Sequence, residues 1–161
     1  MRTVVQRVRR AEVAVGGEVV ARTGPGLLLL VGVARGDGEP DALETARKVA
    51  ALRIFPGRTP MDRTVAEVGG GVVVVSQFTL AGSLRKGNRP SFDGAEDPAR
   101  AEALYLRVAA ALSEAGLPVE TGRFGAAMVV GLENDGPVTF VLDVRGGRVV
   151  ESAPDGTPPV A

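Results

Sequence analysis

The first third of the chain reads as short strand patterns separated by glycine-containing turns. Residues 3–8 and 11–15 are rich in β-branched side chains and partly alternate apolar with polar positions, which is typical of strands with one buried face. Residues 18–22 form the next expected strand, and the apolar run 27–33 is short enough to be a strand buried on both faces. The pattern predicts an antiparallel meander.

Two later segments change to the helical period. Apolar residues recur three and four positions apart from 41 to 53, and again from Pro98 to about Ala115. Pro98 suits a helix start, where its missing N–H is harmless. Between the helices, the apolar run 72–80 predicts a buried central strand, and a polar loop follows from 81 to 97.

The last third returns to strand patterns. Strands are expected at 119–121, 126–133 and 137–144, and the sequence Asn134-Asp135-Gly136 predicts a hairpin turn between the last two. Two helices among roughly seven strands predict an α+β protein of three layers, in which helices cover one side of a sheet-on-sheet core.

Length and composition favour one compact domain. We assign residues 1–145 to that domain and residues 146–161, which are rich in glycine and proline, to a flexible C-terminal tail. Hydrophobic residues are 45% of the chain and charged residues 24%, as in globular proteins. The longest apolar run is far short of the roughly 20 residues that span a membrane, and no signal peptide precedes the first strand, so we expect a cytoplasmic protein.

The absent residue types narrow the chemistry. The chain has no cysteine and no histidine, which excludes disulfides, Cys/His zinc sites, Ser-His-Asp and Cys-His nucleophiles, and an imidazole base. We expect no cofactor and assign no residue to a metal site. The 19 basic and 19 acidic side chains cancel, so any contact with RNA must be local.

Polar residues end the buried run 72–80. Ser76, Gln77 and Thr79 either mark the point where a strand emerges into solvent, or line a pocket with hydrogen-bonding groups. Strand alternation would place Gln77 and Thr79 on the same face.

Two loops also leave two interpretations open. Arg85, Lys86 and Arg89, with Phe92 close by, form either a solvated loop or a site for phosphates and a stacked base. The Gly136-Pro137 step is either an ordinary turn or a rigid wall of backbone carbonyls, because a Gly-Pro bond can be cis at low cost.

Several short motifs in one order resemble the D-aminoacyl-tRNA deacylase family, and the similarity runs from residue 1 to about 144. The motifs are Val4-Val5-Gln6-Arg7-Val8, Leu52-Arg53-Ile54-Phe55, Ser76-Gln77-Phe78-Thr79-Leu80, Arg85-Lys86-Gly87, Arg89-Pro90-Ser91-Phe92, Glu120-Thr121-Gly122-Arg123-Phe124-Gly125 and Asn134-Asp135-Gly136-Pro137-Val138-Thr139. The chain departs from the family at Ala81-Gly82-Ser83-Leu84, and at Asp62 and Thr64, where asparagine and serine are usual.

The resemblance implies a homodimer with a three-layer β/β/α fold and an active site at the subunit interface. A cis Gly136-Pro137 bond would enter the partner's pocket, where its carbonyls would exclude an L side chain and admit a D-amino acid or glycine. Arg7 would lock this loop, and Thr139 follows it.

The resemblance also implies the chemistry and the substrate. Ser76, Gln77, Phe78 and Thr79 would line the pocket at the ester, backbone N–H groups near Phe78 and Thr79 would stabilise negative charge, and the terminal 2'-hydroxyl of the tRNA would take part. Thr79 is either a nucleophile or a positioning group.

The partners implied are the 3' end of aminoacyl-tRNA, which Phe92 would meet, and a second copy of the chain, with no membrane and no DNA. Removal of glycine from mischarged tRNA(Ala) would suit the same pocket. The rival of another class is a non-catalytic module that binds the tRNA end.

Overall fold

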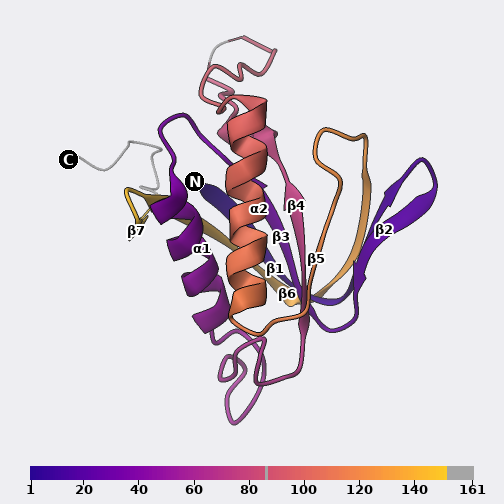
Figure 1. Ribbon diagram of the computed structural model, residues 1–161. Helices are drawn as coiled ribbons and strands as arrows, with labels where there is room; N and C mark the ends of the chain where they lie inside the picture. The colour runs from indigo at the N-terminus through magenta and orange to yellow at the C-terminus, as the bar shows by residue number, and fades with distance from the viewer. Residues whose placement is uncertain (86, 152–161) are drawn as a thin grey trace.

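The computed structural model describes residues 1–85 and 87–151; Lys86 and residues 152–161 lie outside the described residues. Figure 1 shows the order of the elements along the chain. The strands are β1 (Arg2–Val15), β2 (Glu18–Thr23), β3 (Gly26–Gly32), β4 (Gly71–Ser76), β5 (Val119–Thr121), β6 (Val129–Arg145) and β7 (Arg148–Val150). The helices are α1 (Glu39–Ala51), the short 3-10 helix η1 (Phe78–Ala81) and α2 (Pro98–Glu114).

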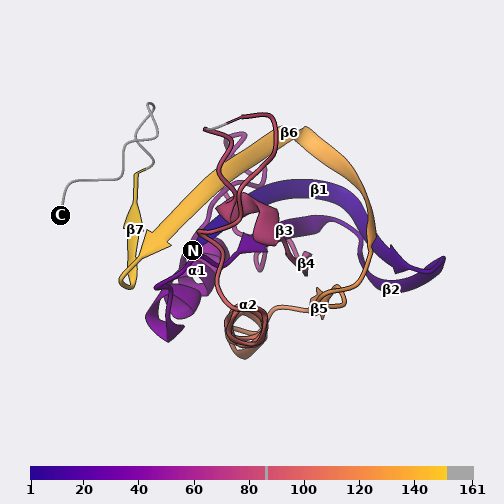
Figure 2. The same cartoon turned by 90° about the horizontal axis from the view of Figure 1, so that it is seen from above.

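All seven strands belong to one mixed sheet. Its order is β5-β4-β3-β1-β6-β7, with β2 paired to β1. Strands β3, β4 and β5 are parallel to one another, and the pairs of β1 with β2, β3 and β6 are antiparallel. The sheet curls strongly, and both helices lie on one of its faces (Figure 2). The predicted α+β class and both predicted helices are confirmed, with α1 beginning and ending two residues earlier than expected.

The larger core lies between the sheet and the two helices. It joins Val5 of β1 and Leu29 of β3 to Val49 of α1 and to Val108 and Leu112 of α2, all fully buried. The apolar positions of both helices therefore face the sheet, as the helical period predicts.

A second, smaller core lies inside the curl, where β1 and β2 face β3 and β4. It contains Val13 and Ala21 on one side and Leu28, Val73 and Val75 on the other. Register shifts in β1 accompany the bend that brings these segments together. The expected sheet-on-sheet packing thus arises from one curled sheet, and not from two separate sheets.

Two boundaries differ from the sequence expectations. The run 72–80 leaves the strand after Ser76, so Phe78 and Thr79 belong to η1. The predicted tail begins with a hairpin, because β7 pairs with the end of β6, from Asp143 to Arg145. The rest of that tail lies outside the described residues.

The predicted hairpin at Asn134-Asp135-Gly136 is wrong. Both halves of β6 pair with β1: Asn134 lies opposite Val8, and Thr139 lies opposite Gln6. Residues 135–138 therefore stand against Arg7 alone and bulge out of a continuing strand. We call residues 134–139 the β6 loop.

Candidate functional site

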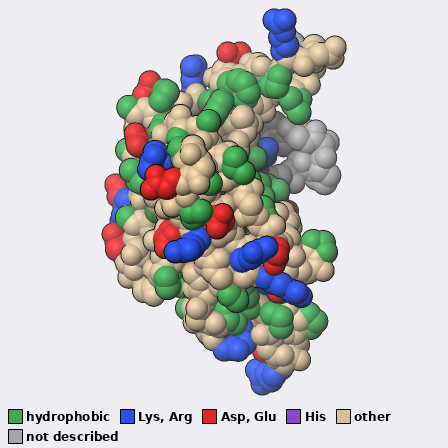
Figure 3. Space-filling view, turned by 90° about the vertical axis from the view of Figure 1, so that its right-hand side faces the viewer, with side chains coloured by type: hydrophobic (Ala, Val, Ile, Leu, Met, Phe, Trp, Pro, Cys, Tyr) green, Lys and Arg blue, Asp and Glu red, His purple; other side chains and the backbone are tan. Residues whose placement is uncertain are grey.

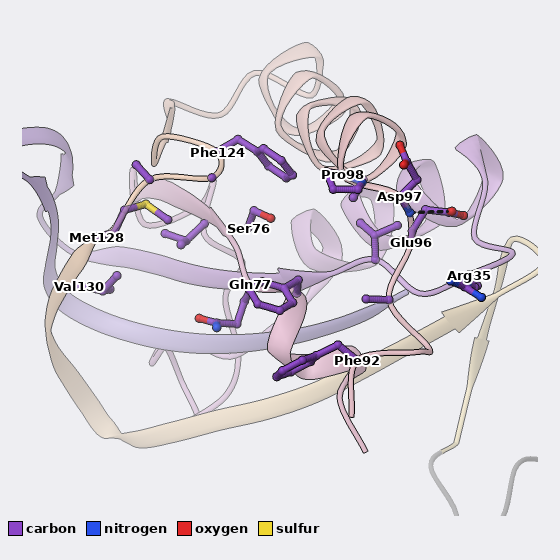
Figure 4. A pocket seen from close by; sticks show the side chains of 17 residues that line it. Arg35, Ser76, Gln77, Phe92, Glu96, Asp97, Pro98, Phe124, Met128 and Val130 are labelled. Atoms are coloured by element: carbon purple, nitrogen blue, oxygen red, sulfur yellow. Dashed lines mark hydrogen bonds between the residues drawn. The ribbon is translucent and has the colours of Figure 1, made fainter. Parts of the chain in front are cut away.

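A pocket of about 740 Å³ opens at the carboxyl end of β4. Its walls come from the end of β4, the start of α2 and the segment 124–130 (Figure 4). The pocket is mostly apolar with a few polar groups, which is the usual composition of a small-molecule site.

Four of the predicted site residues line this pocket: Ser76, Gln77, Phe78 and Phe92. Ser76 is the last residue of β4, and the backbone N–H of Gln77 donates to the carbonyl of Val31 at 2.8 Å, which continues the β3 pairing by one residue. The polar strand end therefore lines a cavity, as one of the two interpretations of Ser76 and Gln77 expects.

Thr79 does not line the pocket directly. The Nε2 amide of Gln77 donates to Oγ1 of Thr79 at 2.5 Å. Because η1 turns the chain after Ser76, this bond comes from a helical turn and not from the strand alternation that was expected. Thr79 is thus placed to orient the Gln77 amide.

Two aromatic rings form the outer rim of the pocket. Phe78 and Phe92 meet edge to face, with ring centroids 5.0 Å apart, and Phe78 is 55% exposed. Gly82 lies beneath them: a Cβ at this position would stand 2.9 Å from the ring of Phe92. Glycine at position 82 therefore lets the Phe92 ring close against η1.

The opposite wall comes from residues that the sequence analysis did not single out as site residues. Phe124 and Met128 line the pocket, and the ring of Phe124 lies 6.1 Å from that of Tyr105. The Tyr105 hydroxyl donates to the carbonyl of Gly122 at 3.1 Å, and burial raises the pKa of Tyr105. A tyrosine on the buried face of α2 was the available signal, because a buried hydroxyl needs an acceptor.

The carboxylates at the pocket serve local structure. Glu96 pairs with Arg100 at 3.5 Å and accepts the backbone N–H of Asp97, and Asp97 caps α2 by accepting the N–H of Ala99 at 3.1 Å. Within the described residues, no cluster of three or more acidic side chains could hold a metal ion. The pocket also presents the hydroxyl of Ser76, the amide of Gln77 and the guanidinium of Arg35.

The β6 loop holds the second group of predicted residues. The Gly136-Pro137 bond is cis, both residues are exposed, and Gly136 has a φ of 149°, a conformation that favours glycine. A Cβ on Gly136 would lie 2.6 Å from the Val138 side chain.

One side chain inside the loop, Asn134, holds it closed. Asn134 accepts the N–H of Val138 at 2.6 Å, and its amide donates to the Val138 carbonyl at 3.2 Å and to Thr139 Oγ1 at 2.9 Å. The sequence predicts a turn at Asn134 and places it in a deacylase-like motif, but it does not reveal these bonds, because the partners of Asn134 lie four and five positions further on in an irregular loop.

Arg7 contacts the β6 loop from its buried side. Its guanidinium is almost fully buried and donates to the carbonyl of Asp135 at 2.8 Å and to that of Ile54 at 2.5 Å. It also pairs with the Asp135 carboxylate at 3.4 Å. The contact expected between Arg7 and the Gly136-Pro137 loop is therefore present.

The β6 loop and the pocket lie at opposite ends of the central strands. Arg7 pairs with Leu27, which pairs with Val72, whereas Ser76 lies four residues further along β4. At about 3.3 Å per residue this is a separation of about 13 Å along the strand. The structure thus groups the predicted residues in two places and does not bring Gly136, Pro137, Thr139 or Arg7 into the chain's own pocket.

Comparison with known proteins gives concordant results. The profile of the D-Tyr-tRNA(Tyr) deacylase family matches residues 4–143. The D-aminoacyl-tRNA deacylase of Paracoccus denitrificans (strain Pd 1222) is 58% identical over 144 residues, which are 89% of this chain and 97% of that protein. The protein of the same name from Anaeromyxobacter dehalogenans (strain 2CP-C) is 60% identical over 146 residues, 90% and 98% of the two chains.

Solved structures share the fold. A c-Myc DNA Unwinding Element Binding Protein superposes with a TM-score of 0.84 at 36% identity, over 91% of this chain and 100% of that one. A probable eukaryotic D-amino acid tRNA deacylase superposes with a TM-score of 0.71 at 18% identity, over 89% and 98%.

The curled mixed sheet, with two helices on one face and a pocket at the end of β4, defines a single-domain α+β protein of the deacylase fold. The chain belongs to the D-Tyr-tRNA(Tyr) deacylase family. In the part of the chain that the structure describes, no helix has the length and apolar character needed to cross a membrane.

Proposed function

We propose that this protein is a D-aminoacyl-tRNA deacylase, which hydrolyses the ester between a D-amino acid and the 3'-terminal adenosine of tRNA and releases both. The observation that carries the proposal is the pocket, because family membership comes with a cavity lined by Ser76, Gln77 and the Phe78–Phe92 pair. A base can stack on exposed aromatic rings, and the amide can hold an ester.

We infer that the protein positions the ester and does not supply a nucleophile. Thr79 accepts a hydrogen bond from Gln77 and does not line the pocket, which suits a role in orienting the amide. The backbone N–H groups of Phe78 and Thr79 stabilise the negative charge that develops on the carbonyl oxygen. The 2'-hydroxyl of the terminal adenosine takes part in the reaction, and no histidine is needed.

We propose that the active site is completed by a second copy of the chain. The exposed β6 loop lies about 13 Å along the strand from Ser76 of its own chain, so its carbonyls serve a pocket only in trans. Strand β6 also exposes Val129, Phe140 and Val141, apolar side chains that a partner would cover.

In this homodimer the Gly136 and Pro137 carbonyls face the substrate α-carbon and exclude an L side chain. Arg7 and Asn134 hold the loop rigid, as discrimination by steric rejection requires. Glycine, including glycine mischarged on tRNA(Ala), fits the same site. The enzyme acts in the cytoplasm, where charged tRNA is used.

The test is release of D-tyrosine, L-tyrosine and glycine from the corresponding charged tRNAs. We expect release of D-tyrosine and glycine, and protection of L-tyrosine. Release of no amino acid would contradict hydrolysis and would support a non-catalytic module that binds the tRNA end. Equal release of D- and L-tyrosine would contradict steric rejection.

A further inference from the structure

An exposed hairpin adjoins the pocket, and its function is not explained by the site itself. Ser83 and Ser91 exchange two backbone hydrogen bonds, of 2.7 and 3.0 Å, and Gly87 takes a φ of 66° at the tip. Figure 1 shows this segment projecting from the end of the molecule where α2 begins. We call the described residues 83–85 and 87–91 the basic arm.

The arm is anchored to the pocket rim through the residue that follows it. Phe92 lines the pocket and packs against Phe78. Arg89 precedes Phe92 by three residues, so its backbone stands at most about 10 Å from that of Phe92 at the rim. A polymer whose end occupies the pocket can therefore leave it along this arm.

The side chains of the arm's arginines have no carboxylate partner, a feature that they share with Arg22, Arg35 and Arg123 among the described residues, and they lie beside the pocket rim. Among the residues that the structure describes, Arg85 and Arg89 are exposed and form no ion pair. Every arginine of β1, α1 and α2, in contrast, pairs with a carboxylate. Positively charged side chains project at the same end in Figure 3.

A charge left unpaired on a protein of zero net charge acts only at short range, because ions screen it beyond about 10 Å. The two arginines therefore do not attract a polyanion from a distance, and they suit direct contact. Their planar guanidinium groups match the geometry of phosphate oxygens.

We propose that the basic arm binds the phosphodiester groups of the single-stranded RNA 3' end, just before the nucleotide that occupies the pocket. This rests on the proposed function, which places the terminal adenosine there. A stacked strand advances about 3.4 Å per nucleotide, so a reach of about 10 Å covers about three nucleotides. Arg85 and Arg89 then contact the backbone of that short segment and carry no part of the chemistry.

The test compares two substrates with the same ester: D-tyrosyl-tRNA, and D-tyrosyl adenosine, which has no phosphate. We expect the double variant Arg85→Ala/Arg89→Ala to lose about tenfold or more in kcat/KM on the tRNA and to match the wild type on the adenosine ester. On the tRNA, the slope of log kcat/KM against log salt becomes shallower by about 0.7 for each arginine removed. Arg85→Lys/Arg89→Lys keeps both charges but not the planar guanidinium groups, so its loss should be smaller than that of the alanine variant.

Arg58→Ala is the matched control. Its side chain is 92% exposed and lies in the loop at the opposite end of the molecule, so it removes one positive charge, as each single variant Arg85→Ala or Arg89→Ala does, without touching the arm. An equal loss for Arg58→Ala would show a general charge effect and overturn the proposal.

The remaining outcomes are also decisive. Equal loss on both substrates means that the arm shapes the pocket, and no loss on either means that it does not touch RNA; both overturn the proposal. Fluorescence anisotropy of a labelled RNA that ends in CCA and carries no amino acid tests the same contact without hydrolysis. A wild type that binds this RNA through the arm but hydrolyses neither ester would contradict the deacylase function alone.

Discussion

The Asn134 side chain makes three hydrogen bonds across the β6 loop and touches no part of the pocket of its own chain. Each bond joins residues on either side of Gly136 and Pro137. Asn134 is therefore a positioning residue for the proposed steric gauge, and its effect should appear in selectivity before it appears in turnover.

We predict that Asn134→Ala lowers the ratio of D- to L-tyrosine release by about tenfold, because loss of such bonds costs about 1 to 3 kcal/mol in loop order. Parallel deacylation assays on the two charged tRNAs measure the ratio. Asn134→Asp keeps the acceptor for the Val138 N–H, and its ratio of D- to L-tyrosine release should lie between those of the wild type and Asn134→Ala. Glu133→Ala, at the exposed neighbouring position, is the control and should leave the ratio unchanged. A lower melting temperature with an unaltered ratio would limit Asn134 to a structural role.

Thr79 offers a second test at the residue scale. If its hydroxyl only orients the Gln77 amide at 2.5 Å, Thr79→Val loses about one hydrogen bond, roughly 1 kcal/mol, and kcat/KM for D-tyrosyl-tRNA falls about fivefold. A nucleophile removed in the same way would cost several orders of magnitude. Thr79→Ser keeps the hydroxyl and should retain activity. Single-turnover kinetics distinguish the two roles.

At the scale of elements, α2 supports the pocket wall through Tyr105. The Tyr105 hydroxyl holds the Gly122 carbonyl, and the Tyr105 ring lies beside that of Phe124. We predict that Tyr105→Phe destabilises the fold by about 1 kcal/mol and raises KM, because the segment 122–128 loses its hydrogen bond to the helix. Urea unfolding and the dependence of rate on substrate concentration measure the two effects. Unchanged stability and unchanged KM would show that the pocket wall keeps its position without the hydrogen bond between Tyr105 and Gly122.

The same residue predicts a pH dependence of stability. Burial raises the pKa of Tyr105 above the ordinary value of 10.0, against a hydrogen bond with Thr121 that lowers it. Above pH 10 the unfolded state ionises the phenol, whereas the folded state keeps it neutral. The contribution of Tyr105 to the free energy of unfolding is therefore complete below pH 10 and is lost as pH rises through the raised pKa. The stability advantage over Tyr105→Phe should shrink above pH 10. Phenolate absorbance measures the pKa directly, because Tyr105 is the only tyrosine.

At the scale of the whole molecule, the separation of the β6 loop from the pocket predicts complementation between chains. If the proposed homodimer forms, an Asn134→Ala chain refolded together with excess Gln77→Ala chain gives heterodimers that combine an intact pocket with an intact loop from the other chain. We predict that L-tyrosine release falls back towards wild type while D-tyrosine release persists. If each pocket used its own loop, mixing would leave L-tyrosine release per Asn134→Ala chain unchanged. In the control, the two chains are refolded separately before they are mixed, so that each pairs with copies of itself.

The secondary structure was largely predictable from local pattern. The helical period marks α1 and α2 within two residues, and the apolar run 27–33 marks β3, because a single element imposes its own period on its residues. The polar end of β4 was recognisable for a similar reason: Ser76 and Gln77 interrupt an apolar run. The absence of histidine and cysteine excluded whole classes of chemistry before any fold was known.

The features that failed prediction depend on pairing between distant segments. Asn134-Asp135-Gly136 has the composition of a hairpin turn, yet β1 pairs with the chain on both sides of it and turns it into a bulge. The β1 pairing begins more than a hundred residues earlier in the chain, so no local window contains it. The same holds for Tyr105 and Gly122, which meet only when α2 packs on the sheet.

By itself, then, the sequence determined the elements, the residue types available for chemistry and the motifs that resemble a deacylase. Only the tertiary structure decided that Ser76 and Gln77 line a cavity, that Thr79 turns away into η1, and that the β6 loop stands about 13 Å along the strand from its own pocket. The physical reason is that local periodicity expresses short-range backbone preferences, whereas a site is made by long-range strand register and by the curl of the sheet.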